Sequence, residues 1–111
     1  MSEIGSLQDL SPLLLLGINT PASAIYLVDK SAFIIGRADT CDAIMSFSGE
    51  IGREHAKIER KANEYVIMDL NSTNKTFLNG YMLEPGVPQP LHPGDRIMFA
   101  ASIFEVEAIN I

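Results

Sequence analysis

Residues 69–80 of this chain read DLNSTNKTFLNG, and they follow the apolar run YVIM of a predicted strand, Tyr65–Leu70. A hairpin needs only about two residues to reverse the direction of the chain. Here five polar residues, Asn71 to Lys75, come before the next short apolar run, Thr76–Leu78, and its Asn-Gly turn. The polar run is longer than a connection requires, so a role other than chain reversal has to explain it.

The same rhythm of short apolar runs and turn residues extends along the whole chain. Runs of about five residues separated by Gly, Pro, Asn, Asp or Ser are typical of an all-β antiparallel sandwich or barrel. The predicted strands are 13–18, 24–28, 33–36, 43–47, 55–59, 65–70, 76–78, 96–100 and 103–109. Residues 84–95, EPGVPQPLHPGD, are predicted as a proline-rich connection. Residues 1–10 are predicted as a frayed, flexible tail, which leaves residues 11–111 as one domain.

Composition argues against several classes of function. The 111 residues carry a net charge of −6 with only 8 Lys and Arg, so nucleic acid is not expected as a partner. The only cysteine, Cys41, permits no intramolecular disulfide, which favours a reducing compartment. Residues 12–24 imitate a signal peptide, but Glu3 and Asp9 precede them without any Lys or Arg. We therefore expect a cytoplasmic protein with no membrane insertion.

Catalytic and metal-binding patterns are not found in the sequence. The two histidines lie 37 positions apart, so no spaced cluster of metal ligands is formed and no metal or cofactor is expected. There is no P-loop, no G-x-S-x-G elbow and no useful pair of carboxylates. His55 is interpreted as structural and Cys41 as an inert core or loop residue. The chain is predicted not to be an enzyme.

Three predicted loops carry hydrogen-bond donors. Arg37 follows a strand that ends in Gly36, Arg53 lies in SGEIGREH at 48–55, and the polar run 71–75 is the third. Loops at one end of a β-sandwich lie close together and often carry function. If these three converge, their guanidinium, hydroxyl, amide and ammonium groups would form a site for a dianion.

Four segments resemble, in order and in spacing, the forkhead-associated (FHA) domain. They are FIIGR at 33–37, GREHAKI at 52–58, YVIMDLNSTNKTFLNG at 65–80 and LHPGDRIMF at 91–99. The resemblance covers about residues 12–108. It implies a SMAD/FHA-type antiparallel β-sandwich of about eleven strands that binds phosphothreonine-containing peptides through loops at one end. The polar run would then be a recognition loop.

The resemblance also implies partners and residue roles. The implied partner is a phosphothreonine-containing protein, such as a Ser/Thr kinase or its substrate, and the domain is expected to be a monomer or part of a larger signalling protein. Arg37 matches the arginine that contacts the phosphate, Thr73 the threonine beside it, and Asn74 the asparagine that holds the peptide backbone. The residues expected to support the loops are Gly36, His55, Asn79 and Gly80.

Two positions depart from the family pattern. Gly52 stands where the family usually has a serine that donates to the phosphate, and losing such a bond costs about 1.5–3 kcal/mol, roughly ten- to a hundredfold in affinity. Lys75 stands where the family commonly has glycine, and a positive φ there would cost about 1 kcal/mol. The charges of Lys75 and Arg53 could compensate, and glycine leaves the loop backbone N–H open to an anion. A phosphate-independent interaction module therefore remains as the alternative.

Overall fold

The computed structural model describes residues 11–21 and 24–109, and the predicted tail, residues 1–10, lies outside the described residues. Strands dominate the described part of the chain. They are β1 (Leu13–Gly17), β2 (Ile25–Val28), β3 (Ala32–Gly36), β4 (Ala43–Ile44), β5 (Ala56–Lys61), β6 (Glu64–Asp69), β7 (Thr76–Leu78), β8 (Tyr81–Met82), β9 (Gln89–Leu91), β10 (Arg96–Phe99) and β11 (Ser102–Ala108).

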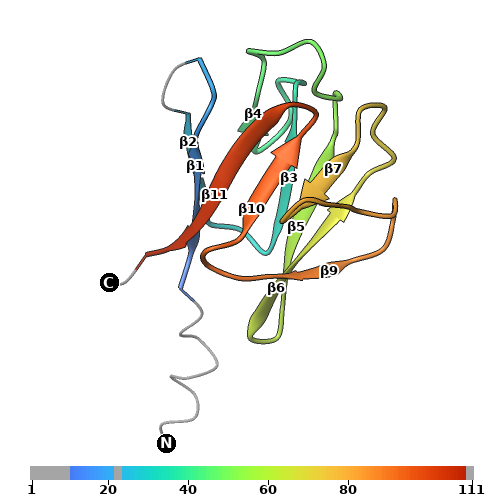
Figure 1. Cartoon of the computed structure of the whole chain (residues 1–111). Coiled ribbons are helices and arrows are strands. Elements are labelled where there is room, and N and C mark those ends of the chain that lie inside the picture. Colours follow the sequence, from blue (N-terminus) through green and yellow to red (C-terminus); the bar gives the residue numbers. More distant parts are fainter. Residues whose placement is uncertain (1–10, 22–23, 110–111) are drawn as a thin grey trace, which may run out of the picture.

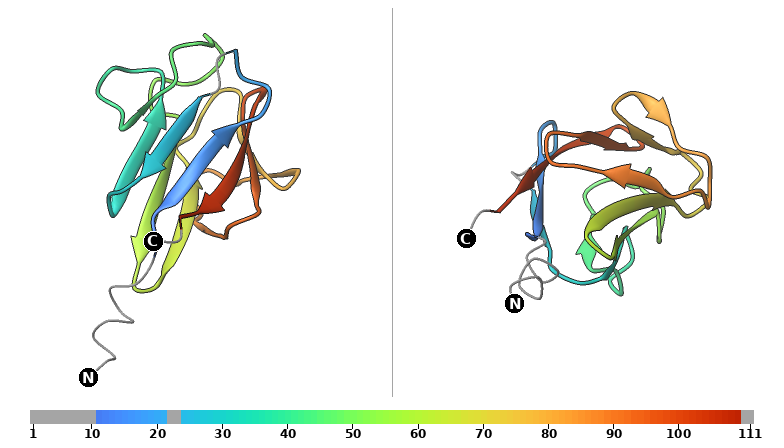
Figure 2. Two further views of the ribbon diagram at one scale, coloured as in Figure 1. Left: turned by 90° about the vertical axis from the view of Figure 1, so that its left-hand side faces the viewer. Right: turned by 90° about the horizontal axis from the view of Figure 1, so that it is seen from below.

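The strands form two sheets that face each other as the layers of a sandwich (Figures 1 and 2). One sheet has six strands in the order β2-β1-β11-β10-β7-β8, and the other has five in the order β4-β3-β5-β6-β9. The predicted all-β sandwich of about eleven strands is confirmed. Its pairings are antiparallel except for β3 with β4, where Ile35 lies beside Ala43 in a parallel pair.

The sequence-based prediction missed two short strands and overextended a third. Gln89–Leu91 lies in the segment predicted as a connection, so that prediction is wrong for β9, and Tyr81–Met82 forms β8. Pro90 is tolerated in β9 because this strand is at the edge of its sheet, where a missing N–H need not break a ladder. The predicted strand 43–47 ends at Ile44.

The core lies between the sheets and follows the alternation expected of half-buried strands. In β11, Ser102, Phe104 and Val106 are buried, and the residues between them are partly exposed. Phe104 packs against Phe99 of β10 with ring centroids 5.8 Å apart. Fully buried isoleucines of the facing sheet, Ile35 and Ile58 among them, complete this layer.

Strand register brings the predicted recognition loops to one end of the sandwich. Ile35 of β3 pairs with Ala56 of β5, and Ala56 in turn pairs with Asp69 of β6. The end of β3, the beginning of β5 and the end of β6 therefore lie at the same end of the five-stranded sheet. In Figure 1 the β4–β5 loop lies at the upper end of the molecule, whereas β1 begins and β11 ends toward the lower end, where Leu13 pairs with Ala108.

Candidate functional site

Arg37 is anchored where β3 passes into the β3–β4 loop. Its backbone N–H donates to the carbonyl of Gly52 at 2.9 Å, and its Nε donates to the carbonyl of Ile51 at 2.9 Å. The side chain is half-buried. Because only Nε is used in this contact, the two terminal nitrogens of the guanidinium keep their donors for a ligand. Arg37 is thus held by the β4–β5 loop (residues 45–55) with its charged end available.

Gly36 allows the β4–β5 loop to pack directly on the end of β3. A Cβ at this position would collide with the carbonyl group of Arg53. That carbonyl accepts hydrogen bonds from Ala38 N and from the Cys41 thiol, both at 3.1 Å. Burial raises the pKa of Cys41, so the thiol keeps its proton and donates. Cys41 therefore helps to hold the backbone of the β4–β5 loop through this hydrogen bond.

His55 ties the β4–β5 loop to the β6–β7 loop (residues 70–75). The ring is fully buried, and its edge packs against Phe99 with centroids 5.7 Å apart. Its Nδ1 accepts from Gly52 N at 2.9 Å, so its Nε2 carries the proton and donates to the Lys75 carbonyl at 2.9 Å. Burial lowers the pKa of His55, which keeps the ring neutral. Both ring nitrogens are therefore engaged in linking the two loops.

Gly52 differs from its predicted role in one respect. Its backbone N–H is donated to His55, so the expectation that this N–H is open to an anion is wrong for Gly52 itself. The position nevertheless has room for a side chain. A Cβ there would have no neighbour closer than His55 Nδ1 at 3.5 Å. The missing hydroxyl is thus a feature of the sequence and is not imposed by packing.

A buried carboxylate shapes the β6–β7 loop from inside. Asp69 is fully buried and accepts three hydrogen bonds: from Ser72 N at 3.0 Å, from Ser72 Oγ at 2.5 Å and from Thr76 Oγ1 at 2.7 Å. Sequence reasoning did not assign a role to these three residues. The available signal was an Asp followed three residues later by Ser, a spacing at which a carboxylate can bond the backbone of a turn.

Two neighbours in the polar run connect this loop to the rest of the site. Asn74 donates from its amide nitrogen to the Glu50 carbonyl at 2.8 Å, across to the β4–β5 loop. Lys75 has a φ of 74°, the left-handed conformation that glycine adopts at less cost. Its carbonyl accepts from His55 and from Ala100 N, the latter at 3.1 Å. The loop is therefore tied to both the β4–β5 loop and the β10–β11 turn.

The structure gathers most of the predicted site residues but not all of them. Arg37, Gly52, Arg53, Asn74 and Lys75 lie on loops joined by the hydrogen bonds above, and the exposed Thr73 lies between Ser72 and Asn74 on the same loop. We call the β3–β4, β4–β5 and β6–β7 loops together the recognition loops.

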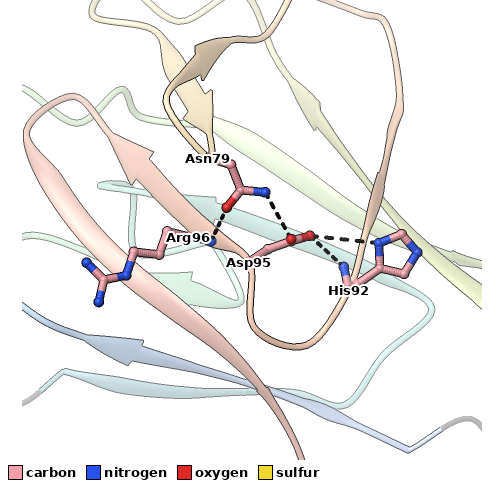
Figure 3. Close-up of polar contacts among 4 residues, drawn as sticks. All are labelled: Asn79, His92, Asp95 and Arg96. Atoms are coloured by element: carbon pink, nitrogen blue, oxygen red, sulfur yellow. Dashed lines mark hydrogen bonds and ion pairs between the residues drawn. The ribbon is translucent and has the colours of Figure 1, made fainter.

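Asn79 and Gly80 lie at the opposite end of β7 from Lys75. Both have positive φ, 51° and 87°, as a two-residue type I′ turn requires. Asn79 donates to Asp95 Oδ1 and accepts from Arg96 N, each at 2.9 Å (Figure 3). Asn79 therefore braces the β7–β8 turn, which also contains Gly80, against the β9–β10 turn and not against the recognition loops.

Another asparagine, which sequence reasoning missed, braces the sandwich next to the recognition loops. Asn19 donates to the Ala101 carbonyl at 2.9 Å and accepts from Ile103 N at 2.8 Å. It joins the β1–β2 and β10–β11 turns. The partners are more than eighty residues away in the sequence, so no local pattern could reveal the contact.

This end of the sandwich presents hydrogen-bond donors and cationic side chains, next to the exposed carboxylates Asp39, Glu50 and Glu54. Guanidinium, ammonium, amide and hydroxyl donors are presented on braced loops, and the histidine among them has both ring nitrogens occupied. Within residues 11–21 and 24–109 there is no group of three or more His, Cys, Asp or Glu arranged to hold a metal ion. Nor does that part of the chain contain a helix of the length and apolarity needed to cross a membrane.

Comparison with known proteins agrees with the geometry. A probable serine/threonine-protein kinase of Dictyostelium discoideum is 34% identical over an alignment 95 residues long, which covers 73% of this chain and 6% of that protein. The chain thus spans only a small part of this relative. The solution structure of an FHA domain from an Arabidopsis thaliana hypothetical protein has a TM-score of 0.81 at 26% identity, covering 91% of this chain and 88% of that one.

The N-terminal FHA domain of Saccharomyces cerevisiae Rad53p, solved with a phosphothreonine peptide, has the same fold. Its TM-score is 0.77 at 19% identity, with 88% of this chain and 94% of that chain covered. The model of the family described as FHA domain matches residues 33–100, which include most of β3, all three recognition loops and β10. This match covers more than half of the sequence, and the chain belongs to the FHA domain family.

Proposed function

We propose that this domain binds phosphothreonine-containing peptides or proteins through its recognition loops, as an interaction module in Ser/Thr kinase signalling. The observation that carries the proposal is the position of Arg37. Its Nε is fixed on the Ile51 carbonyl where the recognition loops meet, and its terminal donors remain available. A fixed guanidinium binds phosphate through two charge-assisted hydrogen bonds at low entropic cost.

The remaining donors complete a phosphate cage in this proposal. The Thr73 hydroxyl and the charges of Arg53 and Lys75 are on exposed positions of the recognition loops. Asn74 uses one N–H on Glu50, so its second N–H and its carbonyl oxygen are left for the backbone of the peptide. We propose that the module performs no catalysis. In support, both ring nitrogens of His55 are engaged in hydrogen bonds between the loops. The proposed compartment is the cytoplasm, in keeping with a protonated, buried Cys41.

The experiment is calorimetric titration with a degenerate phosphothreonine peptide pool and with its unphosphorylated twin. We expect binding of the phosphorylated pool alone, at least tenfold weaker in Arg37→Ala and only partly recovered in Arg37→Lys, because lysine is a point charge without the fork. Arg60→Ala is the matched control, since Arg60 is an exposed arginine of β5, away from the recognition loops. Equal binding of both pools would refute the proposal.

A second candidate is a phosphate-independent interaction module on the same loops. Gly52 favours it, because this position lacks the hydroxyl donor and its N–H is committed to His55. In that case the two pools would bind alike, and Arg37→Ala would change both affinities to the same extent, or neither of them if the interface is on a sheet face.

A further inference from the structure

An apolar row crosses the outer face of the six-stranded sheet. It consists of Ile18, Ile103, Met98, Phe77 and Met82. Cross-strand register aligns Ile103 with Met98, Met98 with Phe77, and Phe77 with Met82, and Ile18 N donates to the Ile103 carbonyl at 2.9 Å. The two ends of the row, Ile18 and Met82, are 46% and 60% exposed, so nothing in the described chain covers them.

The middle of this row is hollowed. A groove of about 370 Å³ is lined by Phe77, Met98 and Ile103, with Arg96 and Asn79 among its polar lining residues. Its volume is at the small end of the range for ligand sites, about 300–1,000 Å³. An apolar floor with a few polar groups beside it is suited to large side chains of a docked polypeptide segment.

The charges beside the row favour a basic occupant. Glu105 and Glu107 follow Ile103 on the same face of β11, because alternate residues of a strand share a face. Glu105 lies opposite Leu16 of β1 and Arg96 of β10. Glu105 and Glu107 thus outnumber Arg96 on this part of the outer face. The whole chain is also acidic, with a net charge of −6.

The row is continuous with the recognition loops. Phe77 comes two residues after Lys75, and Met98 and Ile103 flank the β10–β11 turn, in which Ala100 N donates to the Lys75 carbonyl. Two residues of strand span about 7 Å. A ligand held at Arg37 therefore has its flanking segments within reach of the row.

We propose that the apolar row is a second docking surface for the phosphothreonine ligand. It takes a segment of that ligand with a large aliphatic or aromatic side chain next to a Lys or Arg. This inference rests on the proposed function and extends it, since the phosphate would select the residue and the apolar row would select the partner. The gain should be at least tenfold in affinity, as expected for burying one large apolar side chain.

The test uses phosphothreonine peptides built on the tightest sequence from the degenerate pool. A Leu-Lys-Phe segment is moved stepwise, on either side of the phosphothreonine, over about four to ten residues, a reach of roughly 13–35 Å in extended chain. Affinities are measured by fluorescence anisotropy against the parent peptide without the segment. Wild type is compared with Met98→Thr and Ile103→Thr. Threonine is β-branched and suited to strands, and both positions are already partly exposed to solvent.

Leu27→Thr is the matched control, because Leu27 is exposed on the same outer face but outside the row, on the edge strand β2 opposite Leu14. We expect at least one placement to gain tenfold or more in wild type and in Leu27→Thr, and to lose that gain in Met98→Thr and Ile103→Thr. A parent peptide that binds with no gain from any placement, or a gain that survives Met98→Thr, would overturn the docking surface alone. A parent peptide that fails to bind would overturn the proposed function and this extension with it.

Discussion

At Gly52 a single absent hydroxyl sets the expected strength of the phosphate site. The position has space for a Cβ, with its nearest neighbour at 3.5 Å, and its φ is not among the positive values. Gly52→Ser should therefore fold normally and add a donor facing the phosphate. We expect affinity for the phosphothreonine pool to rise roughly ten- to a hundredfold, from about 1.5–3 kcal/mol. Gly52→Ala, measured by the same calorimetry, isolates the hydroxyl and should show no such gain.

Lys75 combines a strained backbone with a useful charge. At φ 74° a non-glycine residue costs about 1 kcal/mol, so Lys75→Gly should raise the free energy of unfolding by up to about that amount. Lys75→Ala has the same backbone problem and should give no such gain. Urea denaturation distinguishes the two variants. Both remove the ammonium, so both should weaken phosphopeptide binding alike; weakening in only one would show that loop shape, and not charge, sets the affinity.

These residue-scale features were only partly predictable. A positive φ at Lys75 was considered because the family commonly has glycine there, and the structure has it. The hydrogen bond from Gly52 N–H to His55 was not predicted, because it depends on how the buried imidazole ring is oriented. Ring orientation is a property of packing and leaves no pattern in the local sequence.

At the scale of elements, the contact between the end of β3 and the β4–β5 loop depends on Gly36. Gly36→Ala would force its Cβ against the Arg53 carbonyl and push the loop away from β3. Overpacking of this kind costs about 1–3 kcal/mol. We expect a lower urea midpoint and a loss of phosphopeptide binding, because the loop that holds Arg37 is displaced. Gly49→Ala is the control, since a Cβ there has no neighbour within 4 Å; equal effects of the two variants would contradict this account.

The link between the β4–β5 and β6–β7 loops should make stability depend on pH. Burial lowers the pKa of His55, whereas the same residue in the unfolded chain titrates near about 6.5. Below that pH the unfolded chain binds a proton that the folded protein does not. Stability is therefore full above about pH 6.5 and falls on acidification, by up to about 1.4 kcal/mol per pH unit, until the lowered pKa is reached.

Urea midpoints measured between about pH 7.5 and about pH 5.5 test this prediction. His55→Gln should be less stable throughout, because the two loops lose their link, but it should lose the His55 part of the slope. Identical slopes in the wild type and His55→Gln would mean that another group causes the acid destabilisation.

Strand prediction succeeded where the apolar pattern of a strand is clear and failed at the two short strands, β8 and β9, that are mostly exposed. β11 and β6 show clear apolar runs because they lie inside their sheets. β8 is exposed along its whole length and β9 contains a proline, so neither has a periodic apolar pattern to detect. The Asn79-Gly80 turn predicted a reversal correctly, but the strand that follows it is defined by its partner β7 and not by its own sequence.

At the scale of the whole molecule, the three cations proposed to bind the phosphate lie on loops that also carry four carboxylates, Asp39, Asp42, Glu50 and Glu54, in a chain whose net charge is acidic. The chain carries −6, while Arg37, Arg53 and Lys75 lie at the end where we propose the phosphate binds. At about 0.01 M salt the Debye length is about 30 Å, well beyond the radius of gyration of 13.7 Å, so the whole acidic chain repels a phosphopeptide. At about 0.1 M it is about 10 Å, and only nearby charges act.

Affinity for the phosphothreonine pool should therefore pass through a maximum with salt. We expect it to rise between about 0.01 and 0.1 M NaCl, as the distant repulsion is screened, and to fall toward about 1 M, as the local cations are screened in turn. Calorimetry across this series measures both limbs. Asp29→Asn combined with Glu64→Gln removes two exposed charges at turns of the opposite end and should flatten only the low-salt limb. An affinity that keeps rising to about 1 M would show that apolar burial, and not the cations of the recognition loops, holds the ligand.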